Sequence, residues 1–260
     1  AKEVTGADIA VVIMSGDYVQ RGTSAIMPKR LRAEMALKCG AAAVFELPVC
    51  YATGSAELFA YGAVSFLDQL GIVDSLCFGS ECSDLEGLEK VADILLEEPE
   101  EYQSHLKASL KQGMSFPSAR ENALSAYMQT EDYSFLLQDP NNILGIEYLK
   151  ALKKRNSKIR PYTIRRKGSH YHDQDLMSPF GSASAIRSLL AYSGSALSGV
   201  SSARTFENTS FVDILGELEE QVPQSSLELL KDYHRVKYPV YQNDFSLILK
   251  YKLLNKRPDT

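Results

Sequence analysis

The stretch DIAVVIM, residues 8–14, is an almost continuous β-branched run bounded by Gly6 and by Ser15 and Gly16. Such a run predicts a β-strand that is buried on both faces, as in a parallel sheet covered by helices. The preceding residues 1–6 (AKEVTG) predict the last turn of a helix with a glycine stop. We therefore expect the chain to begin in the middle of a longer fold.

Helix and strand signals alternate after this first strand. Helices are predicted at residues 29–39 and 55–70, and two further strands at residues 43–47 and 75–78, with a turn at residues 79–81. Strands that alternate with helices favour an α/β fold with a doubly wound parallel sheet. Ligands of such sheets bind beyond the carboxyl ends of the strands, which here means the loops at Ser15 and Gly79.

The middle of the chain is helical in pattern and ends in a basic run. Residues 85–96, 101–110, 118–128 and 143–152 predict helices, the last of them after a DPNN turn with N-cap character. Residues 150–167 hold nine cations and no acidic residue, with a short strand predicted at residues 162–164. The run is either a solvated face or an electrostatic platform for phosphates, and the sequence leaves both open.

The stretch SPFGSASAIR, residues 178–187, is where we place the chemistry. Ser182 is the expected N-cap of an apolar helix, whose free amides and positive dipole end favour anions. Ser184 and Arg187 are three residues apart and share one face of that helix. They are suited to binding the same anion, although the spacing alone favours an ordinary capped helix with a solvated arginine.

Composition bounds the class of protein. The chain has 260 residues, 45% of them hydrophobic and 23% charged, and its net charge of −5 excludes a basic nucleic-acid coat protein. It has no CxxC pair, and its four cysteines predict reduced, buried thiols of a cytoplasmic protein: Cys39, Cys50, Cys77 and Cys82. A Ser/Gly-rich stretch at residues 193–202 predicts a domain boundary near residue 194, which separates residues 1–194 from the start of a helical domain at residues 195–260.

Common site signatures are absent from the sequence. It contains no P-loop, no GxGxxG after the first strand and no GxSxG motif. His170 and His172 stand beside Asp173, and we interpret them as hydrogen-bonded loop residues in preference to metal ligands. Glu46, at the end of a predicted strand, either orients a group or is satisfied by a backbone amide, and we favour the amide.

Several blocks recur in one order along the chain: MSGDYVQRG (14–22), Lys29, residues 32–36, VFELP (44–48), YA (51–52), SAE (55–57), FGSE (78–81), PNNILG (140–145) and SASAIR (182–187). In order and spacing they resemble the bacterial tRNA(Met) cytidine acetate ligase family, and the resemblance runs from residue 1 to about residue 190. It implies a Rossmann-like nucleotidyltransferase fold of the HUP type with helical insertions. SASAIR resembles the late ISSTxxR-like motif of that fold. The early HxGH motif is missing, so we expect a chain truncated at both ends.

The resemblance implies an ATP-dependent ligase that acts in the cytoplasm. Acetate and ATP, with Mg²⁺, would give acetyladenylate, and the wobble cytidine of elongator tRNA(Met) would then become N4-acetylcytidine. Arg187 would act on the phosphates as the catalytic residue. The nucleotide site would comprise Gly79, Asn141, Arg166, Lys167, Ser182 and Ser184.

Gln20 and Arg21 would face acetate or the cytidine, an assignment that we infer from their place in the first strand-end loop. The basic run from Lys150 would guide the tRNA backbone. The alternatives are an adenylyltransferase for small molecules and, because HxGH is missing, a non-catalytic remnant that binds nucleotide or RNA.

Overall fold

A computed structural model describes most of the chain as two compact units. The described residues are 1–20, 22–129, 133–166, 183, 185–187, 189–190, 211–219, 221–234, 236, 240 and 244–256. Unit 1 comprises residues 1–10 and 54–166, and unit 2 comprises residues 11–53 and 167–260. The boundary expected at residue 194 lies outside the described residues, so the division into 1–194 and 195–260 stays a prediction.

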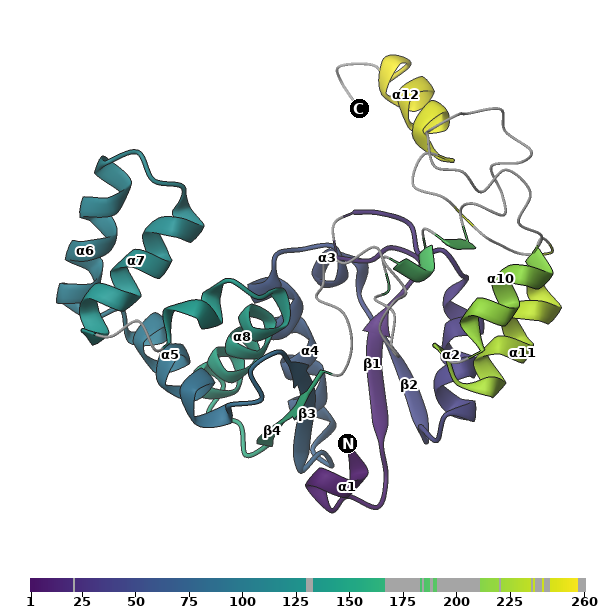
Figure 1. The fold of residues 1–260 in the computed structure, drawn as a ribbon, viewed down its shortest axis with the longest axis horizontal. Helices are drawn as coiled ribbons and strands as arrows, with labels where there is room; N and C mark the ends of the chain where they lie inside the picture. Colours follow the sequence, from purple (N-terminus) through teal and green to yellow (C-terminus); the bar gives the residue numbers. More distant parts are fainter. Residues whose placement is uncertain are drawn as a thin grey trace. The chain divides into compact units, whose positions relative to one another are not determined.

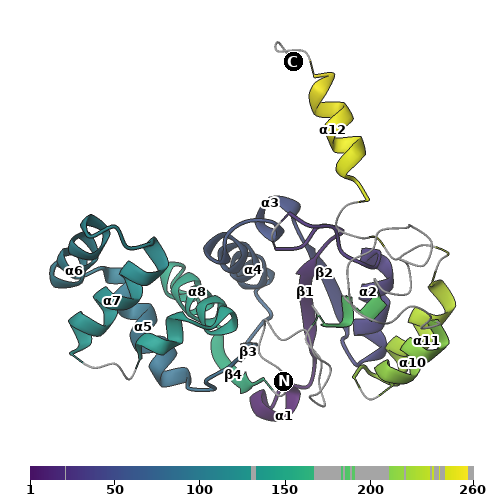
Figure 2. The same ribbon diagram turned by 45° about the horizontal axis from the view of Figure 1, so that its top comes forward.

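Unit 2 contains the first parallel strand pair. β1 (Val11–Ser15) pairs with β2 (Ala43–Leu47) in parallel, from Val11 opposite Ala43 to Ser15 opposite Leu47. α2 (Lys29–Lys38) makes the crossover, and Figure 2 shows β1 and β2 side by side with α2 next to β2. The predicted burial of β1 on both faces is wrong, because every residue of β1 is only half-buried. Ile9, which precedes the ladder, is 68% exposed.

Two helices of unit 2, α10 (Phe211–Leu218) and α11 (Gln224–Tyr233), share one apolar cluster with α2. Leu31 of α2 packs with Leu190 and with leucines and isoleucines of α10 and α11. α3 (Val49–Ala52) directly follows β2, and α12 (Ser246–Leu254) carries apolar side chains that are exposed. The helical pattern predicted for the tail is therefore confirmed in the part of it that is described.

Unit 1 contains the second parallel strand pair. β3 (Ser75–Ser80) pairs with β4 (Arg160–Arg165) from Ser75 opposite Arg160 to Ser80 opposite Arg165. The expected turn at residues 79–81 is wrong for its first two residues, which continue the ladder opposite Ile164 and Arg165 of β4. α1 (Lys2–Thr5) ends at Gly6 with φ of 68°, which confirms the predicted helix stop.

Helices make up the rest of unit 1, and the expected helices are all present. They are α4 (Ala56–Leu70), α5 (Leu85–Glu97), α6 (Glu100–Lys111), α7 (Phe116–Met128), the 3₁₀-helix η1 (Ser134–Leu137) and α8 (Pro140–Lys154). Ser55 caps α4 by accepting a hydrogen bond from the Leu58 amide at 3.3 Å, and Asp84 caps α5 in the same way. Figure 1 shows α6 and α7 lying side by side.

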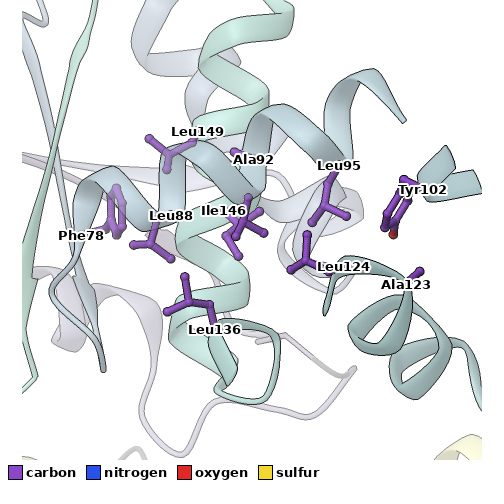
Figure 3. Close-up of a cluster of buried hydrophobic side chains, with 11 residues drawn as sticks. Phe78, Leu88, Ala92, Leu95, Tyr102, Ala123, Leu124, Leu136, Ile146 and Leu149 are labelled. Carbon is purple, nitrogen blue, oxygen red and sulfur yellow. The ribbon is translucent and has the colours of Figure 1, made fainter. Parts of the chain in front are cut away.

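The core of unit 1 lies between α5, α7 and α8 (Figure 3). Leu88, Leu124 and Ile146 are fully buried there, and each contributes roughly 1.5–3 kcal/mol by leaving water. Phe78 of β3 joins the same core and packs against Tyr148, with ring centroids 5.6 Å apart. Burial raises the pKa of Tyr148 to about 12, so this ring stays neutral at physiological pH.

Gly145 leaves room for Phe78 in this core, and its replacement tests the packing. A Cβ at Gly145 would lie 2.7 Å from Phe78 Cε2, and the buried ring has little freedom to move. We expect Gly145→Ala to lower the free energy of unfolding by about 1–3 kcal/mol, despite the better helix propensity of alanine.

The matched control is Gly216→Ala in α10, where a Cβ would meet no atom of the described residues within 4 Å. That change should be neutral or should stabilise by up to about 1 kcal/mol. Urea unfolding of both variants is the measurement. An equal response of the two would show that the Phe78 contact is not what keeps residue 145 small.

The cysteines do not all lie where the sequence predicts. The four cysteines are free thiols, but Cys39 and Cys50 are exposed, so the predicted burial is wrong for these two. Cys39 follows the last residue of α2 and Cys50 lies in the four-residue helix α3, where each side chain meets solvent.

Within the described residues, no helix has both the length and the apolar character needed to cross a membrane.

Candidate functional site

The carboxyl end of β3 brings Gly79 and Arg166 together in unit 1. The Arg166 amide donates a hydrogen bond to the Ser80 carbonyl at 3.0 Å, which continues the β3–β4 ladder by one residue. Arg166 consequently crosses Gly79, where a Cβ would lie 3.2 Å from Arg166 Cγ. The Arg166 side chain is exposed. This strand end therefore presents a bare backbone beside a guanidinium group, a combination suited to a nucleotide phosphate.

The start of α8 is fastened to the segment that follows β3. The Glu81 carboxylate accepts hydrogen bonds from Asn141 Nδ2 and, at 3.0 Å, from the Asn142 amide. In return, Asn142 Oδ1 accepts from the amides of Glu81 at 3.0 Å and Cys82 at 3.2 Å. Asn142 is fully buried and Asn141 is half-buried. Asn141 is thus bound to Glu81, which is the first residue after the end of β3.

Glu81 caps α8 by accepting the Asn142 amide. α8 begins at Pro140, three residues before the predicted start, so Asp139 of the DPNN turn occupies its N-cap position. The Asp139 side chain makes no capping hydrogen bond, and its Oδ2 instead accepts from Asn142 Nδ2 at 3.4 Å. The structural roles of Glu81 and Asn142 were missed. The signal that could have indicated these roles is the acidic Glu81 directly after β3, together with the two asparagines at the start of an apolar helix whose first amides need acceptors.

Unit 2 forms a polar cluster where β1 and β2 end. Asp17 Oδ1 accepts a hydrogen bond from the Lys29 amide at 2.9 Å and so caps the first turn of α2. Lys29 Nζ lies 2.7 and 2.9 Å from the two carboxylate oxygens of Glu46, and the hydrogen bond to Glu46 is the main cause that raises the pKa of Lys29. The interpretation of Glu46 as bound to a backbone amide is therefore wrong. Gly16 lies against this carboxylate, which a Cβ would strike.

Arg32 lies beside this cluster and binds backbone carbonyls. Its Nη2 donates to the carbonyls of Ser15, at 3.0 Å, and Gly16, and its Nε donates to Met27 at 3.2 Å. Burial lowers the pKa of Arg32, the charge of Arg187 lowers it further, and the carboxylates of Asp17 and Glu46 oppose the shift. Arg32 and Arg187 are therefore neighbouring positive charges. The sequence marked Arg32 only as part of a family block.

Arg187 lies on the solvent side of a helix. The described residues between 183 and 190 are helical, which confirms the element predicted there. Ala185 and Leu190 are buried, Leu190 in the cluster with Leu31, whereas Arg187 is exposed. The remaining members of the predicted site lie outside the described residues and stay predictions: Arg21, Lys167, Ser182 and Ser184. His170 and His172, interpreted as hydrogen-bonded loop residues, also lie outside the described residues.

Gln20 lies at the tip of a short hairpin that follows β1. Tyr18 and Ser24 form an antiparallel bridge, and the amides of Val19 and Ala25 bond to the carbonyls of Thr23 at 2.9 Å and Asp17 at 2.8 Å. Gly22 closes the tip with φ of 76°, which is a left-handed conformation that favours glycine. The half-buried Gln20 is consequently presented at a defined position in unit 2.

The basic run divides into paired and unpaired cations. Ion pairs join Lys150 to Glu147 at 2.8 Å, Lys153 to Asp93, Lys154 to Glu57 at 3.0 Å and Arg155 to Asp68 at 3.0 Å. These four side chains are therefore engaged within unit 1. By contrast, four exposed cations have no acidic partner within 4.0 Å among the described residues: Lys158, Arg160, Arg165 and Arg166.

Comparison with known proteins places the chain among nucleotidyltransferases. A family model described as HIGH nucleotidyl transferase matches residues 1–260. A tRNA(Met) cytidine acetate ligase of Thermoanaerobacter sp. (strain X514) is 45% identical over 259 residues, which cover 99% of this chain and 60% of the relative. The relative of the same name in Caldanaerobacter subterraneus subsp. tengcongensis is 45% identical over 257 residues, 98% of this chain and 59% of the relative. The chain thus spans about 60% of the length of these relatives.

Solved structures show the same likeness. The crystal structure of apo Thermotoga maritima TmcAL matches 98% of this chain and 57% of its own, with a TM-score of 0.85 and 36% identity. TmcAL bound with alpha-thio ATP matches 98% of this chain and 56% of its own, with a TM-score of 0.81 and 36% identity. These matches confirm the predicted α/β fold of the nucleotidyltransferase type.

Proposed function

This chain belongs to the HIGH nucleotidyl transferase family, and from that membership we propose that it is the ATP-binding part of a ligase that acetylates tRNA. The proposed reaction uses ATP and acetate to form N4-acetylcytidine at the wobble position of elongator tRNA(Met). The observation that carries the proposal is the 45% identity to tRNA(Met) cytidine acetate ligases along 99% of the chain. The alpha-thio ATP bound to the similar TmcAL supports the nucleotide as a substrate.

The first step activates acetate. A carboxylate oxygen of acetate attacks the α-phosphorus of ATP, the bond between the α-phosphorus and the bridging oxygen breaks, and pyrophosphate leaves acetyladenylate behind. Negative charge grows on the leaving phosphates, so a positioned guanidinium group supplies much of the rate. Arg187 is assigned to these phosphates, and Arg166 and Gly79 are assigned to the nucleotide at the end of β3. The proposed nucleotide site also includes Asn141, Lys167, Ser182 and Ser184.

The second step transfers the acetyl group. The N4 amine of the cytidine attacks the acetyl carbonyl carbon, AMP leaves, and the amine loses one proton. Gln20 at the hairpin tip and its neighbour Arg21 are assigned to acetate or the cytidine. The unpaired cations Lys158, Arg160 and Arg165 are better candidates for tRNA phosphates than the cations of α8, because their charge is not already engaged by a carboxylate.

Magnesium is proposed to enter with ATP. Mg²⁺ keeps several waters and is commonly held by substrate phosphates with one or two carboxylates, without a dedicated protein cage. Among the described residues, no group of three or more His, Cys, Asp or Glu side chains gathers as a metal site. When bound, the ion neutralises the phosphate oxygens, and the guanidinium groups of this chain orient them.

Two measurements test the proposal. Mass analysis of bulk tRNA should show loss of N4-acetylcytidine in cells that lack the gene, and its return on complementation. A plain adenylyltransferase for small molecules predicts unchanged tRNA. Calorimetry of the purified 260-residue chain should show saturable binding of ATP, and α-thio ATP should compete for the same site. Absence of nucleotide binding, together with unchanged N4-acetylcytidine, would exclude the ligase.

A further inference from the structure

We propose that Arg32 is a positioning residue that holds the hairpin of residues 17–25 in place on the acceptor side of the site. This inference rests on the proposed function, because it assigns the hairpin to the substrate that receives or supplies the acetyl group. Arg32 itself is not assigned to any substrate atom. Its role is to fix where Gln20 stands.

The hairpin is a compact loop whose own hydrogen bonds do not determine where it sits. The bonds of Val19 to Thr23 and of Ala25 to Asp17 define its two-stranded form. An isolated hairpin of this length is marginally stable in water at best, because few residues pack against one another. Its position must therefore be set by contacts at its base, where it joins β1 and α2.

Arg32 provides these contacts at both ends of the connection between β1 and α2. The carbonyls of Ser15 and Gly16 begin the connection, and the carbonyl of Met27 lies just before its end at α2. One guanidinium group thus joins the two ends. The planar fork of arginine presents five donors in a fixed, spread geometry that suits carbonyls on two separate segments, whereas the three donors of lysine share one compact ammonium group.

The base of the hairpin has a second fastening that works with the first. Asp17 is the first hairpin residue, and its Oδ1 accepts a hydrogen bond from the Lys29 amide. Lys29 Nζ in turn donates to the Glu46 carboxylate near the end of β2. Gly16 permits the close approach of the Glu46 carboxylate. The hairpin is therefore fixed to α2 through Arg32 and Asp17, and α2 is fixed to β2 through Lys29.

The contacts of Arg32 distinguish it from Arg187. The Nε and Nη2 hydrogens of Arg32 are engaged by backbone carbonyls, and the side chain is half-buried. Arg187, its electrostatic neighbour, is exposed. An exposed guanidinium group is accessible to a phosphate, whereas one engaged by carbonyls holds backbone. The two arginines therefore divide the binding of phosphate and the positioning of the loop between them.

The experiment compares Arg32→Ala and Arg32→Lys with the matched control Arg30→Ala, an exposed arginine on the same helix. For Arg32→Ala we expect the exchange of the Val19 and Ala25 amides to accelerate by at least about tenfold. We also expect KM for acetate or for tRNA to rise by at least about fivefold, while KM for ATP changes by less than about twofold. Arg32→Lys should lie between Arg32→Ala and the unchanged protein, and Arg30→Ala should change neither quantity.

Other results would overturn the inference. Amide exchange in the hairpin that matches that of Arg30→Ala would show that Arg32 does not hold the loop. An equal rise of KM for all three substrates would indicate a general structural role. Should Arg32→Ala fail to fold, Arg32→Lys carries the same test. If the unchanged protein forms no acetyladenylate, the proposed function fails, and the exchange measurement still decides whether Arg32 fixes the hairpin.

Discussion

Arg187→Ala should slow acetyladenylate formation by at least about tenfold, which is the size expected for one lost contact to a phosphate in the transition state. Arg187 is exposed on the helix that packs against α2, and Arg32 beside it is engaged by carbonyls. Arg187 is therefore the arginine of this pair that is available to a phosphate. The measurement is acetate-dependent release of pyrophosphate under saturating ATP.

Two further variants make this result specific. Arg187→Lys keeps the charge and loses the planar fork, so it should recover only part of the rate. Arg30→Ala removes an exposed arginine from α2 in the same unit and should leave the rate unchanged. Pyrophosphate release that is unchanged in Arg187→Ala would remove this residue from the phosphate site.

The second large effect is expected at Gly79, where valine should weaken ATP binding by at least about tenfold. Already a Cβ at this position would lie 3.2 Å from Arg166 Cγ and 4.0 Å from the Ile164 carbonyl, and a valine adds two methyl groups to it. The branched side chain would displace Arg166 and cover the backbone at the end of β3. Calorimetric titration with ATP measures the loss.

The control for Gly79→Val is Ser75→Val, which places the same side chain at the other end of β3. Ser75→Val should bind ATP as the unchanged chain does, because the amino end of a parallel strand lies away from the site. Thermal unfolding of both variants checks that β3 still pairs with β4. Equal ATP affinity of the two variants would exclude Gly79 from the nucleotide site.

Strands and helices were predictable because their signals are local. The apolar run of β1, the glycine stop at Gly6 and the caps at Ser55 and Asp84 act over a few residues, and the structure contains each of these elements. The ends of elements were less predictable. β3 continues through Ser80 because its backbone pairs with β4, which lies about eighty residues later in the sequence and is not visible in the local pattern.

The partners of charged residues could not be predicted from the sequence. Residues 150–155 form a basic stretch in the sequence, yet four of their side chains meet Glu147, Asp93, Glu57 and Asp68, three of which belong to other helices. Glu46 likewise pairs with Lys29 from the preceding helix. Such pairs depend on which faces of the helices pack against one another, and a linear charge pattern does not contain that information.

The sequence alone determined the α/β class, the order of strands and helices, and the blocks that mark a nucleotidyltransferase, because hydrophobic period, caps and motif spacing are local properties. Only the tertiary structure decided how the functional side chains are divided. It placed Arg166 across Gly79, engaged Arg32 with the ends of the connection between β1 and α2, and gave the capping of α8 to Glu81. These choices follow from the parallel pairing of distant strands, since that pairing sets which loops and helix starts become neighbours.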